Sequence, residues 1–186
     1  MNETLEQARA LLENARRIVA VTGAGISAES GVPTFRGPEG LWKSHRPEEL
    51  ATAEAFARDP QTVWEWYGWR RELIATCSPN PAHLALARLA LDHPEVAIIT
   101  QNVDGLHTRA ATEEAGHVDF SPALPIELHG SINRDRCSAC DARRPGSPVI
   151  DVTSIDTLPQ CDRCSALMRP DVVWFGEVLN EVILDR

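Results

Sequence analysis

Residues 17–28 read Arg-Ile-Val-Ala-Val-Thr-Gly-Ala-Gly-Ile-Ser-Ala, an apolar run that leads directly into two closely spaced glycines. The apolar run is typical of a strand buried in a parallel sheet. The spacing Gly23-x-Gly25-x-x-Ala28 then fits the turn that brings a dinucleotide pyrophosphate to the start of a helix. An ordinary strand-to-helix turn fits the same residues, and no acidic ribose anchor is evident on a following strand. A dinucleotide bound at this turn would therefore be held differently from one in a standard dehydrogenase.

Strand and helix patterns alternate along the remaining chain. Apolar spacing predicts helices over residues 4–15, 62–75 and 82–91, and short buried strands over 96–100, 126–129 and 172–175. Residues 31–50 contain several prolines and glycines and are expected to form an ordered loop. The alternation predicts an α/β fold with a Rossmann-like parallel sheet.

Two Cys-x-x-Cys pairs lie in the second half of the chain. Cys137 and Cys140 form one pair, Cys161 and Cys164 form the other, and twenty residues separate the pairs. Four thiolates at this spacing can close a tetrahedral shell around one structural zinc ion. The chemistry is then expected elsewhere, and the isolated His129 upstream is the first candidate. The fifth cysteine, Cys77, is interpreted as a packing residue.

The bulk composition excludes several classes of protein. The chain has 186 residues, 43% of them hydrophobic, and a formal net charge of −9. An acidic chain lacks the basic face of a nucleic-acid binder, and no stretch approaches the roughly 18 apolar residues of a membrane span. The acidic N-terminus is not a secretory signal. Together with the cysteine spacing, these features predict a cytoplasmic protein; they do not indicate its oligomeric state.

Five motifs, in order along the chain, make the sequence similar to the sirtuins, the NAD-dependent protein deacylases. Residues 23–36 resemble their cofactor loop, residues 100–107 their nicotinamide-pocket motif, and residues 127–131 the segment with their catalytic histidine. The two cysteine pairs and residues 173–177 follow in the order of the family.

The resemblance implies NAD-dependent removal of an acyl group from a protein lysine, which gives nicotinamide and an O-acyl-ADP-ribose. His129 would be the catalytic general base on a ribose hydroxyl, a task that suits an imidazole at neutral pH. The partner would be an acylated lysine in a protein or peptide. The implied NAD-binding residues are Gly23, Ala24, Gly25, Ile26, Ser27, Thr34, Phe35, Arg36, Trp42, Gln101, Asn102, Asp104 and His129.

The predicted helix over residues 62–75 carries a possible specificity signal. Arg70 falls near the middle of the apolar arc of this helix, three residues after Tyr67. A phenol and a guanidinium suit a carboxylate ligand. From the pattern alone, however, a buried arginine paired with a protein carboxylate is the favoured interpretation. Tyr-x-x-Arg resembles the sirtuin subclass that prefers succinyl- and malonyl-lysine, with Ala51 at its small-residue position. The implied substrate-binding residues are Ala51, Tyr67, Arg70, Val173, Trp174, Phe175 and Gly176.

The expected organisation is a Rossmann-like unit over residues 1–45 and 78–131, a helical acyl-pocket segment over 46–77, a zinc-binding module over 132–170, and a return with a peptide-binding strand over 171–186. Residues 111–125 are longer than the family's connection; they are expected near the mouth of the site, or more simply as a solvated insertion. The chain ends at Arg186, so the parallel sheet is expected to be incomplete at its C-terminal side.

Other readings remain open at this point. The short C-terminus favours a catalytically weak or inactive module that binds zinc, peptide and NAD, while His129, Asn102 and Asp104 oppose that reading. ADP-ribosyl transfer to protein would use the same cofactor chemistry. A zinc-ribbon nucleic-acid binder is opposed by the acidic charge.

Overall fold

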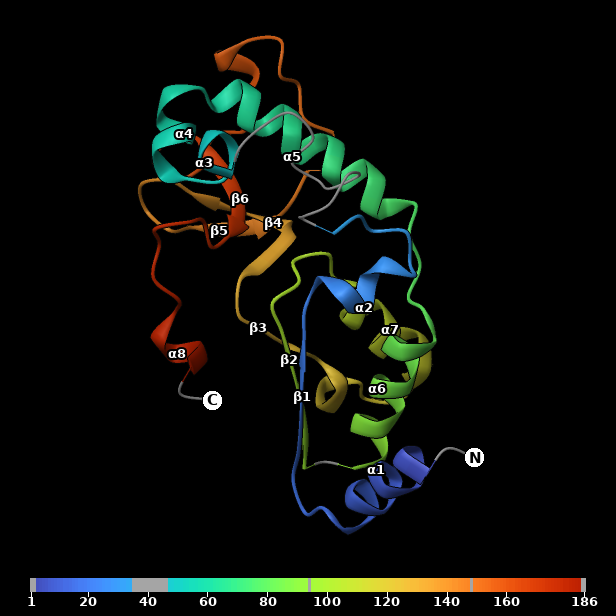
Figure 1. Ribbon diagram of the computed structural model, residues 1–186. Helices are drawn as coiled ribbons and strands as arrows, with labels where there is room; N and C mark the ends of the chain where they lie inside the picture. The colour runs from blue at the N-terminus through green and yellow to red at the C-terminus, as the bar shows by residue number, and fades with distance from the viewer. Residues whose placement is uncertain (1–2, 35–46, 94, 148, 185–186) are drawn as a thin grey trace.

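The strands of this protein form two separate sheets, one parallel and one antiparallel (Figure 1). The computed structural model describes residues 3–34, 47–93, 95–147 and 149–184. The parallel sheet has the order β1-β2-β3, with β1 at Ile18–Thr22, β2 at Val96–Thr100 and β3 at Ile126–Glu127. The antiparallel sheet has the order β5-β4-β6, with β4 at Gly130–Cys137, β5 at Arg143–Pro145 and β6 at Met168–Val172. This arrangement confirms the predicted α/β fold with a parallel sheet and a separate cysteine module.

The register of the parallel sheet brings three chain segments to one edge. Thr22 pairs with Thr100, and Thr100 pairs with Glu127. Because parallel strands end at the same edge of a sheet, the segments after these three residues leave the sheet side by side. Those segments contain the glycine turn, the residues from Gln101 onward, and His129.

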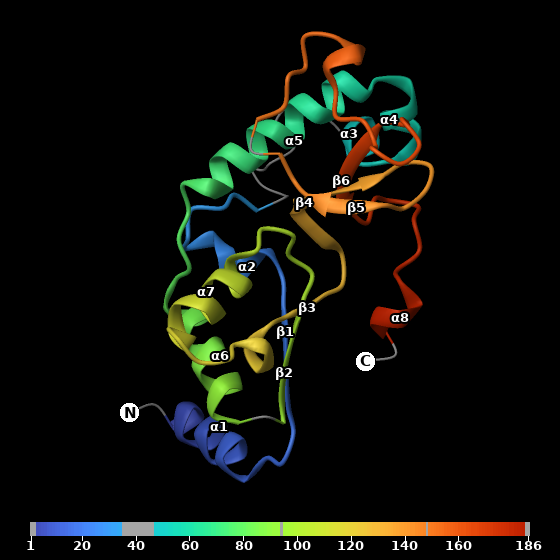
Figure 2. The ribbon, with the colours of Figure 1, turned by 180° about the vertical axis from the view of Figure 1, so that it is seen from behind.

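Helices cover one face of the parallel sheet (Figures 1 and 2). These are α2 at Ala24–Ala28, α6 at Pro81–Asp92 and α7 at Leu106–Ala115; α1 spans Glu3–Asn14. Asn80 begins α6 because its side chain accepts hydrogen bonds from the backbone N–H groups of Ala82 and His83, and Pro81 suits the first helical position. On the opposite face, the side chains of Val19 and Val21 are 59% and 63% exposed.

A second group of helices packs against the antiparallel sheet. It comprises α3 at Pro47–Leu50, α4 at Ala53–Arg58 and the long α5 at Pro60–Ala75. Asp59 starts α5 by accepting a hydrogen bond from the Thr62 N–H at 3.1 Å. The fully buried Trp64 then donates its indole N–H to the carbonyl oxygen of Met168 in β6 at 3.0 Å. The helix that carries Tyr67 is therefore attached directly to the antiparallel sheet.

Several boundaries differ from the predictions. The strand predicted over residues 172–175 is wrong, because β6 ends at Val172 and pairs with β4 instead. Residues 111–125 end α7 and continue through the 3-10 turn η1, Ser121–Ala123, which contacts α6 and β2; Ala123 is fully buried. Within this segment only Ala111, Ala115 and Ala123 are buried, and residues 116–122 are exposed. It is therefore a largely solvated connection, as the simpler expectation had it.

A second 3-10 turn, η2, spans Ile155–Thr157, and a short helix, α8, spans Glu181–Leu184. Phe35, Arg36 and Trp42, three predicted cofactor residues, lie outside the described residues. Across the described ranges, no helix is both long and apolar enough to cross a bilayer.

Two glycine-to-alanine substitutions should have opposite effects on stability. Gly130 has φ +76°, and an added Cβ would overlap the Asp171 carbonyl oxygen; we expect Gly130→Ala to lower the free energy of unfolding by at least about 2 kcal/mol. Gly68 lies within α5, and no described atom lies within 4 Å of an added Cβ. We expect Gly68→Ala to raise the free energy by about 0.5–1 kcal/mol. Urea denaturation of both variants checks the pair; equal effects would contradict the turn geometry.

Candidate active site

A buried polar cluster joins the glycine turn to the segment after β2. The Asn102 Nδ2 group donates to the carbonyl oxygen of Gly23 at 3.0 Å and contacts Ser27 Oγ at 3.1 Å. Ser27 Oγ in turn donates to Asp104 Oδ2 at 2.7 Å. All three side chains are buried, with exposed fractions of 8% or less. Hydrogen bonding therefore holds Asn102 and Asp104 in one orientation beside the turn.

The two glycines of the turn leave open space. Gly23 has φ −143° and ψ −168°, an extended conformation that other residues also adopt. Among described atoms, none lies within 4 Å of a Cβ built on Gly23 or Gly25. Among the described residues, neither backbone strain nor packing therefore explains these glycines, and their backbone is open on this side.

His129 lies at the same edge with a defined tautomer. The Leu128 N–H donates to the Thr100 carbonyl oxygen at 2.9 Å, which extends the pairing of β2 with β3 and carries His129 next to Gln101. Nδ1 of His129 lies 3.0 Å from the Gln101 carbonyl oxygen. A carbonyl oxygen can only accept, so Nδ1 carries the proton and Nε2 presents its lone pair. The half-buried ring can thus take a proton from a ligand.

The structure distributes the other predicted cofactor residues as follows. Ala24 lines a cavity of about 20 Å³ together with Ser27, Val32, Pro33, Arg70, Asn102, Val103 and Asp104. Gly25 and Ile26 lie in α2, and Thr34 follows Pro33 directly. This cavity has room for about one water molecule. A larger group needs its walls to move apart.

Two buried histidines, His83 and His107, pack against this cluster. The sequence did not indicate this role for them. The rings of His83 and His107 meet edge to face, with centroids 4.8 Å apart and an interplanar angle of 61°, and both residues are almost fully buried. His107 Nε2 lies 2.9 Å from the Thr22 hydroxyl, which donates to the Thr100 hydroxyl at 2.8 Å. His83 Nε2 lies 3.4 Å from Ser27 Oγ. The capping position of His83 after Asn80 was the one sequence signal for its placement.

Burial keeps both rings neutral. Loss of hydration and, to a smaller extent, the neighbouring His83 lower the pKa of His107 to about 4, while Asp104 opposes the shift. Desolvation also lowers the pKa of His83, again against the effect of Asp104. A neutral imidazole suits a network of hydroxyl groups because it can donate through one nitrogen without a buried charge.

The His107 environment makes stability depend on pH. A histidine with a lowered pKa in the folded state takes up its proton more readily when unfolded, so its contribution is present above about pH 6.5 and is lost as the pH falls toward 4. We expect the wild type to lose up to about 3 kcal/mol across this window relative to His107→Gln. Urea denaturation at pH 7.5, 6 and 5 measures the difference; a constant difference between the two proteins would contradict this environment.

Tyr67 and Arg70 lie together on α5, close to the cluster. The Arg70 guanidinium carbon lies 4.7 Å from the Trp66 ring centroid and 5.5 Å from that of Tyr67. The Tyr67 hydroxyl accepts a hydrogen bond from Trp174 Nε1 at 2.9 Å. Burial lowers the pKa of Arg70, while Tyr67 and Asp104 act to raise it. Burial also raises the pKa of Tyr67. A cationic group is therefore held against aromatic rings in a wall of the cavity.

The predicted substrate residues 173–176 lie between two other segments of the chain and are hydrogen-bonded to both. The Val173 N–H donates to the His129 carbonyl oxygen at 2.9 Å, and the Phe175 N–H donates to that of Ala51 at 3.0 Å. The Trp174 N–H donates to Glu177 Oε2 at 2.8 Å. These three donors are used within the chain, so strand pairing of a peptide with residues 173–176 would rest on their carbonyl oxygens. Phe175 is 59% exposed, and Gly176 follows it with φ +85°.

The four predicted metal ligands come together in two similar turns. The sulfur atoms of Cys137, Cys140, Cys161 and Cys164 all lie within 4.8 Å of one another. Three of the sulfur–sulfur distances are 3.5, 3.6 and 3.5 Å. A tetrahedral zinc with Zn–S bonds of about 2.3 Å requires a spacing of about 3.8 Å. The cluster therefore fits one structural zinc ion.

The two turns share their backbone geometry. The Cys137 N–H donates to the Ala142 carbonyl oxygen at 2.8 Å, and the Cys161 N–H donates to that of Ala166, also at 2.8 Å. The residues after the second cysteine of each pair, Asp141 and Ser165, have φ +55° and +59°. Equivalent turns present equivalent sulfur pairs, which is why the two halves of the shell match.

Metal binding should depend on the four clustered cysteines and not on Cys77. We expect a chelator to release one zinc ion per chain and to lower the thermal midpoint, because structural zinc supplies folding free energy to a small module. Cys161→Ser should lose the metal, whereas Cys77→Ala should retain it, since Cys77 lies outside the cluster. Metal content by mass spectrometry and thermal unfolding measure both effects. An unchanged thermal midpoint after metal loss would contradict the structural role.

Comparison with known proteins agrees with this geometry. The Sir2 family profile matches residues 23–185. The chain is 52% identical over 171 residues to NAD-dependent protein deacylase 2 of Pyrobaculum aerophilum. The matched stretch covers 92% of this chain and 63% of that protein. It is 50% identical over 185 residues to the NAD-dependent protein deacylase of Thermococcus kodakarensis, covering 98% and 68%. A Sir2 homologue solved as a complex with NAD is 46% identical, with a TM-score of 0.76, over 97% of this chain and 66% of that one.

These matches define the class of protein. The chain belongs to the Sir2 family. It spans about two thirds of the length of the curated relatives it matches.

Proposed function

We propose that this protein removes acyl groups from lysine side chains in an NAD-dependent reaction. Acyl-lysine, NAD and water would give free lysine, nicotinamide and O-acyl-ADP-ribose. The observation that carries this proposal is the His129 imidazole, which presents Nε2 at the sheet edge where Asn102, Asp104 and the open glycine turn meet. The relatives named NAD-dependent protein deacylases support it.

Each group has a role that its geometry allows. His129 Nε2 takes a proton from a ribose hydroxyl, because the Gln101 carbonyl oxygen holds the other nitrogen in its protonated form. Asn102 and Asp104 orient the nicotinamide and ribose part of NAD, since Ser27 already fixes both side chains. The bare backbone at Gly23 and Gly25 lets phosphate groups approach. The zinc shell has no open position for a ligand, which gives it a structural role.

The same site supports a preference for succinyl and malonyl groups over acetyl. Arg70 lines the cavity beside Asn102 and Asp104, and desolvation there strengthens its attraction for a carboxylate. The Tyr67 hydroxyl lies on the same helix and accepts from Trp174, so its own proton is available for a carboxylate oxygen. Ala51 is small, and its carbonyl oxygen accepts from the Phe175 N–H, which places it beside the segment proposed to bind the peptide. A longer acyl chain would require the cavity walls to move apart. Malonyl and succinyl groups supply the carboxylate that this wall would bind.

The first test is nicotinamide release with NAD and a succinyl-lysine peptide beside an acetyl-lysine peptide of the same sequence. We expect faster release with the succinyl peptide. Arg70→Met should lower kcat/KM for that peptide roughly ten- to hundredfold, because a hydrogen-bonded charge contributes about 1.5–3 kcal/mol. The acetyl reaction should change little.

Two histidine variants serve as controls for the same assay. His129→Ala should lower kcat for both peptides roughly 10²- to 10⁴-fold, the usual contribution of a general base. His117→Ala removes an exposed histidine and should leave both rates unchanged. Equal losses of succinyl and acetyl cleavage in Arg70→Met would refute the acyl preference while leaving the deacylase proposal intact. Release of nicotinamide with neither peptide would refute the deacylase activity of this chain.

A further inference from the structure

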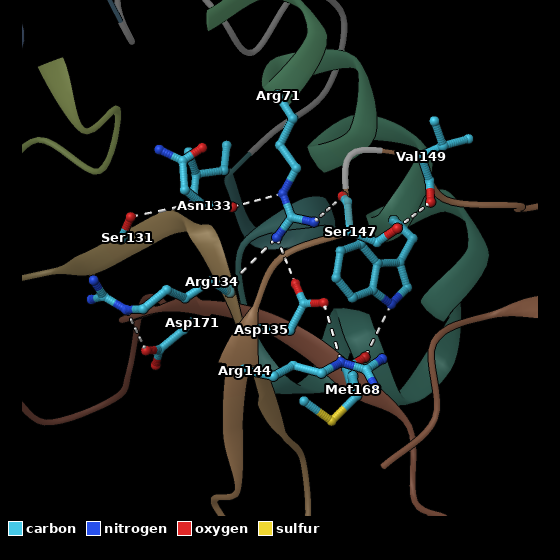
Figure 3. Close-up of polar contacts among 12 residues, drawn as sticks. Arg71, Ser131, Asn133, Arg134, Asp135, Arg144, Ser147, Val149, Met168 and Asp171 are labelled. Carbon is cyan, nitrogen blue, oxygen red and sulfur yellow. Dashed lines mark hydrogen bonds and ion pairs between the residues drawn. The ribbon is translucent and has the colours of Figure 1, made fainter. Parts of the chain in front are cut away.

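The residue after Arg70 on α5 makes an unusually complete set of hydrogen bonds. Arg71 is 8% exposed, and its Nε–H donates to the Ile132 carbonyl oxygen at 2.7 Å. Nη1 donates to the Ser147 carbonyl oxygen at 3.1 Å, and Nη2 donates to that of Arg134 at 3.3 Å. Figure 3 shows these contacts converging from β4 and from the loop after β5. A single guanidinium thereby fixes α5 against the antiparallel sheet.

A buried carboxylate completes the arrangement. Arg71 Nη2 lies 2.6 Å from Asp135 Oδ1, and the Asp135 side chain has no exposed surface. Its other oxygen lies 3.9 Å from Arg144 Nε (Figure 3). Desolvation of such a pair offsets much of its attraction, so buried pairs contribute more to position than to stability in some proteins.

The backbone at Gly146 lies close against this pair and leaves little room for a side chain. A Cβ on Gly146 would lie 2.9 Å from Arg71 Nη2 and 3.0 Å from the Asn133 carbonyl oxygen. The Gly146 N–H donates to that same oxygen at 2.8 Å. The chain therefore closes over the Arg71 guanidinium, which leaves little freedom for α5 to rotate.

Two short connections lead from this pair to the nicotinamide side of the site. Ile132, whose carbonyl oxygen accepts from Arg71, donates its own N–H to the Val103 carbonyl oxygen at 2.9 Å. The neighbouring Asn133 donates from Nδ2 to the Asp104 carbonyl oxygen at 3.3 Å. A Cβ on Gly105 would lie 2.7 Å from Asn133 Nδ2, so the turn after Asp104 lies directly against this side chain.

We propose that Arg71 and Asp135 are positioning residues that hold the acyl-binding helix in register with the Asp104 turn. They set the rotation of α5, and with it the direction in which Arg70 and Tyr67 face the cavity. This inference rests on the proposed deacylase function and deepens it. It assigns acyl selectivity partly to a pair that touches neither the acyl group nor NAD.

The kinetic test uses the full chain and two variants. Asp135→Asn keeps the shape but removes the charge, and Arg71→Met/Asp135→Leu removes both charges so that neither remains buried alone. We expect kcat/KM for the succinyl peptide to fall about tenfold, mainly through KM, with the acetyl value changing less than about threefold. Arg88→Gln breaks an exposed pair with Glu114 elsewhere and serves as the matched control. An unchanged succinyl-to-acetyl ratio in folded variants would overturn the proposal.

A second readout does not depend on activity. In Asp135→Asn, hydrogen exchange should become faster at the backbone amides of residues 102–106 and stay at the wild-type rate in β1. In the Arg88→Gln control, exchange at both segments should stay at the wild-type rate. Unchanged exchange at residues 102–106 would overturn the positioning role. If the wild type cleaves neither peptide, the deacylase proposal fails, and the exchange measurement still decides whether the connection from α5 to Asp104 exists.

Discussion

The pairing of Thr22 with Thr100 is the constraint on which the site depends. These residues end β1 and β2 at the same level, and their hydroxyls form a 2.8 Å hydrogen bond. The Thr100 hydroxyl also accepts from the Asn102 N–H at 3.1 Å, so the side-chain bond between strands directs the backbone of the segment that follows. A slip of one residue in this register would place the two hydroxyls on opposite faces of the sheet, break their hydrogen bond and separate Asn102 from the glycine turn.

The antiparallel module depends on its cysteine cluster. Its strands are short, and its two cysteine turns bring four sulfur atoms together where a larger domain would place apolar side chains. Small units need such a cross-link because their burial of apolar surface is limited. The module in turn carries α5 through Trp64 and Arg71, which are buried in contact with β6 and β4. The cysteine cluster and the helix that carries Arg70 thus belong to one packed unit.

Much of this arrangement was predictable from the sequence, and the remainder has identifiable reasons. Apolar periodicity located β1, β2, α5 and α6 within a few residues, because those elements bury one face. The cysteine spacing predicted the cluster, since ligand geometry requires short loops. The strand expected at residues 172–175 lies instead at 168–172, because β6 is selected by pairing with β4, which local pattern does not encode. Likewise, His83 and His107 read as unremarkable residues until the fold buries them together.

Arg70 and Arg71 show where sequence reasoning reaches its limit. They are adjacent, both are at most 8% exposed, and helical geometry separates their directions by about 100°. Arg71 meets a protein carboxylate, which is the arrangement that the sequence analysis considered for Arg70. Arg70 lies over the Trp66 and Tyr67 rings and lines the cavity beside Asn102 and Asp104. The buried pairing of Arg71 depends on Asp135, sixty-four residues away along the chain, and the local helical pattern carries no sign of it.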